Sequence, residues 1–194
     1  MFPATSMPDR DWWQTLWPSP EETIKLIGVK SNMIAIDICC GDGYFTVPLA
    51  TLCDRVYGIE LDSSLLEQAS RYSTERGVTN CQWIEGDAMN ATQLITEKVD
   101  FVLMANTFHG IPDKAGMINI IAGLLKTNGK FVVINWYDKP REETIVLGLP
   151  RGPKSEMRMS PEILSSMLIS SGFSLEKTVD VSPFHYASIF TVTH

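Results

Sequence analysis

The sequence predicts an α/β fold built on a mostly parallel sheet of seven strands, with helices on both faces. Five apolar runs between residues 33 and 136 are mostly continuous rather than alternating, which is typical of strands that are covered on both faces. Stretches with helical periodicity lie between these runs, and this alternation indicates parallel strands joined by crossover helices. Two further apolar runs close the chain without a helix between them, so we expect an antiparallel last pair.

Each expected element has its own local signals. A short helix is expected within residues 11–29, because Pro20 and two glutamates mark a first turn and Gly28 lies near the end. The expected strands cover residues 33–38, 55–61, 80–86, 99–106 and 129–136, and the helices between them cover residues 44–53, 63–76 and 114–125. No internal repeat interrupts this order.

The pattern changes after residue 136, where a loop rich in Pro, Gly and Arg begins. A helix is then expected in SPEILSSMLISSGF, because Ser160 suits the N-cap, Pro161 the first helical position and Gly172 the end. The last two strands are expected around residues 175–181 and 187–192, joined through SPFHY.

Length and composition limit the possible functions. A chain of 194 residues, 44% of them hydrophobic, is expected to form a single domain. The net charge of −7 argues against a nucleic-acid partner, because its phosphates would be repelled. No apolar run approaches membrane-spanning length and the start lacks the features of a secretory signal, so we expect no membrane association and a cytoplasmic location.

A metal site is not expected. The four cysteines stand at positions 39, 40, 53 and 81, without the paired short spacings of zinc ligands. The three histidines are scattered, so buried free thiols and isolated imidazoles are the default interpretation.

The strongest local signal is AIDICCGDGYFT, in which a strand ends in Asp37 and continues through Gly41 and Gly43 into a helix. Small residues at such a turn let the backbone approach a ligand, and the helix start offers unpaired amide donors. Tight packing between strand and helix is the alternative explanation. Thr46 stands where a dinucleotide-binding fingerprint has its third glycine, which disfavours a nicotinamide cofactor.

Two more strand ends carry ligand-binding candidates. Glu60 ends the second strand, where a carboxylate can accept hydrogen bonds from ribose hydroxyls, and the adjacent Leu61 can cover a purine ring. The alternative is that Glu60 caps the next helix. Asp87 and Ala88 follow the third strand and can address the edge of the base, although Gly-Asp is also an ordinary turn. All three strand ends meet at the carboxyl edge of a parallel sheet, where such folds bind ligands.

With this ordered set, the chain resembles the class I S-adenosylmethionine-dependent methyltransferases over roughly residues 30–136. The resemblance implies a three-layer Rossmann-like methyltransferase fold and S-adenosylmethionine as cofactor. It places Glu60 at the ribose, Leu61 on adenine, and Asp87 with Ala88 at the adenine edge. The residues expected around the methionine portion are Asp37, Cys39, Gly41, Gly43, Ala105 and Asn106. The chain departs from the family at Cys39, where a glycine is usual, and in LLKTNGK, where a proline and glycine turn is commoner.

The resemblance also divides the single domain of residues 1–194. Residues 1–30 are expected to form a helical lid segment, residues 31–136 the cofactor-binding core, and residues 137–194 the substrate-side loop, helix and closing strands. Methyl transfer is an in-line displacement that mainly requires alignment and exclusion of water, so no acid or base is obligatory. A small-molecule acceptor is expected because little chain lies outside the core, and the locally basic loop after residue 136 suits an anionic one.

Candidates on the acceptor side carry weaker signals. His109 follows the fourth strand and can take a proton from the acceptor, or it is a structural loop residue. Arg151 lies in a locally basic loop and can clamp an acceptor, or it is simply solvated. Trp13, Trp17 and Tyr186 can line the acceptor site, or they pack in the core. Alternatives for the whole chain are a protein that binds S-adenosylmethionine without transfer, a nicotinamide-dependent oxidoreductase, or an interaction module.

Overall fold

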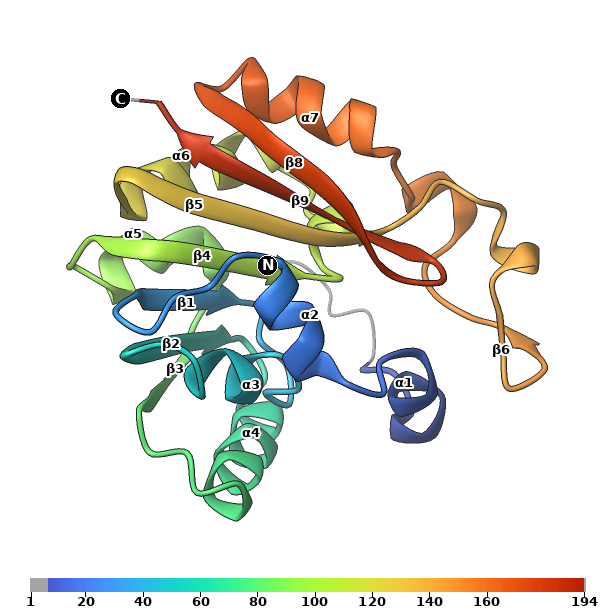
Figure 1. Ribbon diagram of the computed structural model, residues 1–194, viewed down its shortest axis with the longest axis horizontal. Coiled ribbons are helices and arrows are strands. Elements are labelled where there is room, and N and C mark those ends of the chain that lie inside the picture. The colour runs from blue at the N-terminus through green and yellow to red at the C-terminus, as the bar shows by residue number, and fades with distance from the viewer. Residues whose placement is uncertain (1–6, 194) are drawn as a thin grey trace.

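The computed structural model describes residues 7–193 and shows one central twisted sheet of seven strands (Figure 1). Their order across the sheet is β3-β2-β1-β4-β5-β9-β8. The strands are β1 (Ile34–Ile38), β2 (Arg55–Glu60), β3 (Cys81–Glu85), β4 (Val99–Ala105), β5 (Leu125–Trp136), β8 (Phe173–Ser182) and β9 (His185–Val192). Residues 1–6 of the expected lid segment and His194 lie outside the described residues.

The strand directions confirm the predicted fold class. Strands β3, β2, β1, β4 and β5 run parallel, whereas β9 is antiparallel to both β5 and β8. The register pairs Ile38 with Ile59 and Glu60 with Glu85, so the ends of β1, β2 and β3 lie along one edge. The side chains that follow these strands therefore start from neighbouring positions.

Helices cover both faces of the sheet. They are α1 (Arg10–Leu16), α2 (Pro20–Leu26), α3 (Thr46–Ala50), α4 (Ser63–Glu75), α5 (Ala91–Leu94), α6 (Lys114–Leu124) and α7 (Pro161–Ile169). In β4, Phe101 and Leu103 face one buried cluster with α1, α2 and α3, while Val102 and Met104 face a second cluster with α6 and α7. This double burial accounts for the continuous apolar runs in the sequence. Among residues 7–193, no helix is long and apolar enough to cross a membrane.

Several element boundaries differ from the predicted ones. The leading segment forms two helices rather than one, because the chain turns at residues 17–19 between α1 and α2. Helix α3 is shorter than the predicted 44–53, because the glycine turn occupies the preceding residues and Thr46 is the first helical residue. Strand β3 is only partly buried, since it is the edge strand.

The loop after β5 contains structure that the sequence did not predict. Strands β6 (Ile145–Val146) and β7 (Leu149–Pro150) form a small antiparallel hairpin whose turn has Leu147 and Gly148 at positive φ. This hairpin and α1 lie beyond the carboxyl ends of the parallel strands, at the right of Figure 1. Helix α1 contacts strand β6 of the hairpin.

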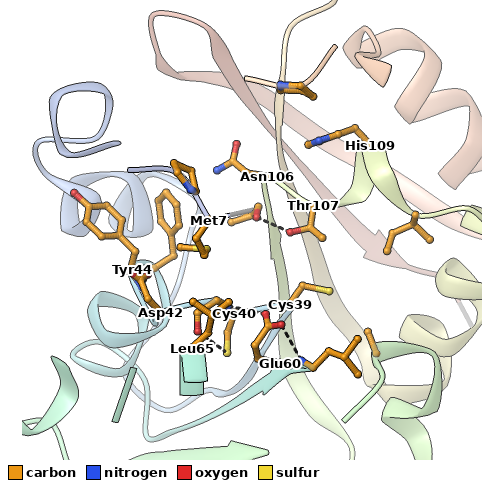
Figure 2. Close-up of a pocket in the computed structure, with 18 of the residues that line it drawn as sticks. Met7, Cys39, Cys40, Asp42, Tyr44, Glu60, Leu65, Asn106, Thr107 and His109 are labelled. Atoms are coloured by element: carbon orange, nitrogen blue, oxygen red, sulfur yellow. Dashed lines mark hydrogen bonds between the residues drawn. The ribbon is translucent and has the colours of Figure 1, made fainter. Parts of the chain in front are cut away.

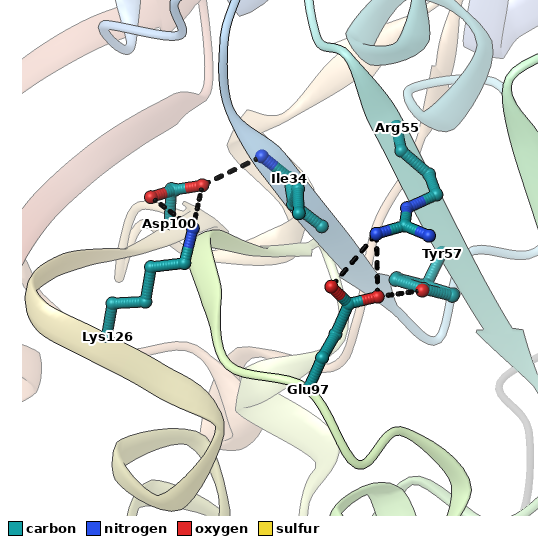
Figure 3. A network of polar contacts seen from close by, with 6 residues as sticks. All are labelled: Ile34, Arg55, Tyr57, Glu97, Asp100 and Lys126. Carbon is teal, nitrogen blue, oxygen red and sulfur yellow. Dashed lines mark hydrogen bonds and ion pairs between the residues drawn. The ribbon is translucent and has the colours of Figure 1, made fainter.

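A polar network ties the strands together at the opposite, amino-terminal edge (Figure 3). The Asp100 carboxylate accepts hydrogen bonds from Ile34 N at 2.9 Å and from Lys126 Nζ at 2.8 Å. The Glu97 carboxylate pairs with Arg55 at 2.8 Å and accepts a hydrogen bond from the Tyr57 hydroxyl. These contacts link β1, β2, β4 and β5 at a distance from the ligand-binding edge.

Candidate active site

A large cavity of about 980 Å³ opens at the carboxyl edge of the sheet. Its wall comes from the ends of β1, β2, β3 and β4, from the segment around α1, and from the loop after β5. Figure 2 shows Cys39 and Glu60 at one side of this space and Asn106 with His109 toward another. Most of the candidate residues from separate strand ends are thus brought together.

The turn after β1 requires left-handed backbone at three positions. Cys39, Gly41 and Gly43 have φ values of 60°, 56° and 80°. Glycine adopts this conformation without strain, whereas a side chain disfavours it, which explains why a glycine suits position 39 better than cysteine does. Gly41 borders the cavity, and a Cβ there would lie 2.7 Å from Met7 Sδ. Gly43 instead packs against Ala69 on α4 and does not line the cavity.

Glu60 is held at the cavity wall by backbone donors. Its Oε2 accepts a hydrogen bond from Gly41 N at 3.0 Å, and its Oε1 accepts one from Leu61 N at 2.8 Å. Only 9% of the residue is exposed. Each carboxylate oxygen has more than one lone pair, so the group retains capacity to accept further hydrogen bonds from a ligand.

The next strand end contributes Asp87 and Ala88. The Asp87 carboxylate accepts a hydrogen bond from Met89 N at 2.9 Å and so caps the 3₁₀ turn at Ala88–Asn90. Asp87, Ala88 and Leu61 all line the cavity. Leu61 is partly exposed, which leaves an apolar surface for a flat ring.

Ala105 and Asn106 border the cavity at the end of β4. Asn106 has a φ of 59°, and both polar atoms of its side chain are buried without a hydrogen-bond partner in the described part of the chain. An unpaired buried amide is unfavourable unless a ligand or water satisfies it. Asn106 is therefore suited to bind polar groups of a ligand.

Asp37 lies behind the cavity wall rather than in it. The residue is buried, and its Oδ2 accepts a hydrogen bond from Thr46 Oγ1 at 2.6 Å. Burial raises the pKa of Asp37 to about 7, since desolvation disfavours the charged form, the Thr46 bond only partly opposes this, and the Glu60 charge adds to it. In this position Asp37 joins the end of β1 to the start of α3.

His109 lines the cavity from the 3₁₀ turn at Phe108–Gly110. Its Nδ1 lies 2.9 Å from Asn135 Oδ1 on β5. Burial lowers the pKa of His109 below its usual value, the Asn135 bond partly opposes this, and the nearby Lys114 and Arg158 charges lower it further. The ring is accordingly neutral at pH 7 and able to accept a proton.

The far end of the cavity is aromatic and basic. Trp12, Trp13 and Trp136 line it together with Arg151 and Gly152. The Arg151 guanidinium lies 5.2 Å from the centre of the Trp12 ring, and its Nε is buried without a hydrogen-bond partner among residues 7–193. Trp136 packs so closely on Gly152 that a Cβ at that position would lie 2.8 Å from the ring.

The other cations of this loop have different places. Arg158 is buried and donates to the carbonyl oxygens of Pro153, Lys139 and Arg151, at 3.1, 3.0 and 2.9 Å, so it holds the loop in shape. Arg141 and Lys154 line the cavity, whereas Lys139 does not.

Trp17 and Tyr186 do not line the cavity. Both are fully buried, and the Tyr186 hydroxyl donates to Met159 O at 3.1 Å. His185 begins β9 rather than lying in a turn, and its ring packs against Trp17 and Trp136. These residues support the aromatic wall from behind.

Sequence reasoning missed several lining residues. Among them are Met7, Pro8, Asp42, Tyr44, Met89, Ile111, Trp136 and Met157. Asp42 and Tyr44 lie inside the glycine turn, so their positions in the sequence could have predicted that they lie near a ligand. Met7 and Met157 carry no local signal, because only the packing of the leading segment and the loop brings them to the site.

A family model described as a methyltransferase domain matches residues 29–165. The chain belongs to this methyltransferase family. The chain carries a methyltransferase domain, and this confirms the family, the fold class and the cofactor predicted from the sequence. A nicotinamide cofactor and a pure interaction role are thereby set aside.

Among similar curated proteins is a demethylmenaquinone methyltransferase from Geobacillus sp. (strain WCH70), 27% identical over 117 residues, which are 59% of this chain and 50% of that protein. A tRNA (uracil-5-)-methyltransferase homolog B from Mus musculus is 34% identical over 94 residues, 48% of this chain and 19% of that protein. The chain thus spans half or less of the length of these relatives. A solved S-adenosylmethionine-dependent methyltransferase from Aquifex aeolicus shares the fold, with a TM-score of 0.78 and 19% identity over 97% of this chain and 100% of that chain.

The expectation that nucleic acid is excluded as a partner is wrong. A tRNA methyltransferase and a 23S rRNA (uracil(1939)-C(5))-methyltransferase from Legionella pneumophila both match part of this methyltransferase. Net charge describes the summed field of the whole molecule, whereas acceptor choice depends on the surface beside the cavity. The acidic composition therefore does not decide the class of acceptor.

The residues around the cavity fit S-adenosylmethionine. The unpaired amide of Asn106 suits the charged groups of the methionine portion, and Glu60 suits a ribose diol. Gly41 leaves its backbone accessible where a Cβ would collide with Met7. Polar groups for both ends of the cofactor are present in one space.

Proposed function

We propose that this methyltransferase acts on a small-molecule acceptor that loses a proton on methylation, and that His109 takes this proton. The observation that carries the proposal is the His109 ring. It lines the cavity, is neutral because burial lowers its pKa, and is anchored on one side by Asn135. A neutral imidazole at hydrogen-bonding distance from an acceptor is a suitable general base.

We assign the cofactor-binding residues as follows. Glu60 accepts the ribose hydroxyls, Leu61 covers adenine, and Asp87 with Ala88 contacts the adenine edge. Gly41, Cys39, Ala105 and Asn106 surround the methionine portion. Asp37 and Gly43 act from behind, by fixing the turn that presents Gly41.

When bound, S-adenosylmethionine supplies a methyl group whose bond to sulfur breaks, with the electron pair staying on sulfur, as the acceptor bonds to the carbon. The chain contributes alignment and exclusion of water. Trp12 and Trp13 on α1 and the loop after β5 enclose the acceptor end, and His109 faces it. The proton lost by the acceptor moves to His109.

The size of the cavity supports a small-molecule acceptor. A volume of about 980 Å³ lies at the upper end of the range for small-molecule sites, which leaves room for a second ligand beside the cofactor. The aromatic end favours an acceptor with an apolar or planar body, and Arg151 offers donors to its oxygen atoms. The name of one relative, demethylmenaquinone methyltransferase, is consistent with such an acceptor. The cytoplasmic location stays a prediction.

The test measures transfer of a labelled methyl group from S-adenosylmethionine to a panel of phenols, quinols and amines and, in parallel, to total tRNA and rRNA. We expect saturable transfer to at least one small acceptor. His109→Gln is expected to lower turnover by roughly 100-fold or more while cofactor affinity stays unchanged. Transfer to RNA alone would show that the proposed class of acceptor is wrong. Wild-type turnover in His109→Gln would show that His109 is not the general base.

A further inference from the structure

We propose that Asn135 is a positioning residue that holds His109 in the tautomer with its proton on Nδ1, so that Nε2 faces the acceptor as a free base. This inference rests on the function proposed for the same site. Asn135 lies on β5, 26 residues along the chain from His109, and is fully buried.

The orientation of the Asn135 amide follows from its second contact. Trp136 N donates a hydrogen bond to Asn135 Oδ1 at 3.1 Å. A backbone N–H cannot donate to an amide nitrogen, so the atom shared by Trp136 and His109 is the oxygen. An oxygen only accepts, so the His109 Nδ1 that lies 2.9 Å away is the donor.

The tautomer of His109 then follows from the single proton of a neutral imidazole. With that proton on Nδ1, Nε2 carries a lone pair. Among residues 7–193, the hydrogen bond of the His109 ring is made by Nδ1, which leaves Nε2 available, and the residue lines the cavity. The backbone of β5, through Trp136 N and Asn135, thus selects which ring nitrogen is basic.

The charges around His109 are mostly positive. Those that act on the ring are Lys114 at the start of α6 and Arg158 in the loop after β5, with the neutral His185 on β9 nearby. Asp113, Arg141, Arg151 and Lys154 line the same cavity. Asn135 is neutral, so it orients the ring without raising its basicity as a carboxylate would.

The first experiment measures the tautomer directly, by long-range ¹⁵N–¹H NMR of histidine side chains in the full-length protein with S-adenosylhomocysteine. The His109 signals are assigned by their loss in His109→Gln. We expect the proton on Nδ1 in the wild type and a shift toward Nε2 in Asn135→Ala. A wild-type proton on Nε2 would overturn the proposal. This measurement needs no acceptor, so it is independent of whether the proposed function holds.

The second experiment follows the pH dependence of turnover. Asn135→Asp keeps the acceptor atom and adds a negative charge next to the ring, which is expected to move the acidic limb of the kcat profile upward by about 1–3 pH units. Asn128→Asp adds the same charge at an exposed position toward the other end of β5 and is the matched control, for which the acidic limb should not move. Asn135→Ala is expected to lower kcat by about 10-fold with little change in KM.

If the acidic limb of the kcat profile lies at the same pH in Asn135→Asp and in the wild type, the positioning role is wrong, even if the enzyme is active. Absence of turnover with every acceptor would contradict the proposed function instead, while the NMR measurement still decides the tautomer. The two failures are thereby distinguished.

Discussion

Gly41 and Glu60 are joined by a hydrogen bond of 3.0 Å from the Gly41 amide to Glu60 Oε2, although 19 residues separate them. This bond ties the glycine turn after β1 to the end of β2. The other oxygen of Glu60 accepts Leu61 N and Asp62 N. The carboxylate is therefore preorganised at the cavity wall before any ligand binds.

Glu60→Ala is expected to weaken S-adenosylmethionine binding by about 1.5–3 kcal/mol, the range for hydrogen bonds to a charged group. This corresponds to a roughly 10- to 150-fold higher Kd in calorimetric titration. Glu67→Ala, on the exposed face of α4, is the matched control and should bind as the wild type does. Unchanged affinity in a folded Glu60→Ala protein would contradict the ribose assignment.

Arg151→Ala is expected to leave the cofactor Kd within about 2-fold and to raise the KM for the acceptor by about 10-fold, because one charge-assisted hydrogen bond is lost. Steady-state kinetics with the acceptor found in the transfer assay measure this. Arg71→Ala, on exposed α4, removes the same side chain elsewhere and should have wild-type kinetics. If Arg151→Ala weakens only cofactor binding, Arg151 acts at the cofactor end of the cavity and not at the acceptor end.

Asp37 makes the stability of the fold depend on pH. Its pKa of about 7 is above the unfolded value, so the folded state holds a proton that the unfolded state releases. This contribution to stability is fully present below about pH 4 and is lost as pH rises through 7, by up to about 1.4 kcal/mol per pH unit. Asp37→Asn should remove this dependence.

Urea unfolding of the wild type and Asp37→Asn at pH 5, 6, 7 and 8 measures the effect. The stability of the wild type relative to Asp37→Asn should fall as the pH rises. Asp54→Asn, at an exposed position, should run parallel to the wild type. If the free energy of unfolding varies with pH in the same way in Asp37→Asn and in the wild type, the Asp37 carboxyl is ionised in the folded protein throughout this range.

Cys39 is strained by its left-handed backbone, with a φ of 60°. Cys39→Gly relieves the strain but loses some packing, so its free energy of unfolding should lie within about 1 kcal/mol of the wild type. Cys39→Val should be less stable than Cys39→Gly by at least about 1–2 kcal/mol, since a β-branched side chain tolerates this backbone poorly. Equal stability of the two variants in urea unfolding would contradict this view. Cys81→Val, in the extended strand β3, is the control that should be tolerated.

Much of the core was readable from the sequence because the signals are local. Continuous apolar runs indicated strands covered on both faces, and the ends of those strands placed Gly41, Glu60 and Asp87 at one edge. The acceptor end was less readable. The hairpin at Ile145–Pro150 and the packing of Trp136 on Gly152 depend on contacts between segments that carry no matching local pattern.

The sequence by itself determined which segments form the parallel strands and where the cofactor edge lies, since a residue at the end of such a strand has only one edge to occupy. Only the tertiary structure decided which candidates face the cavity. Asp37 and Gly43 are drawn behind the wall by Thr46 and Ala69, and Tyr186 is buried under the loop. Likewise, the sequence around His109 does not predict its contact with Asn135. That contact forms because β5 packs beside β4, which brings together two residues that are 26 positions apart.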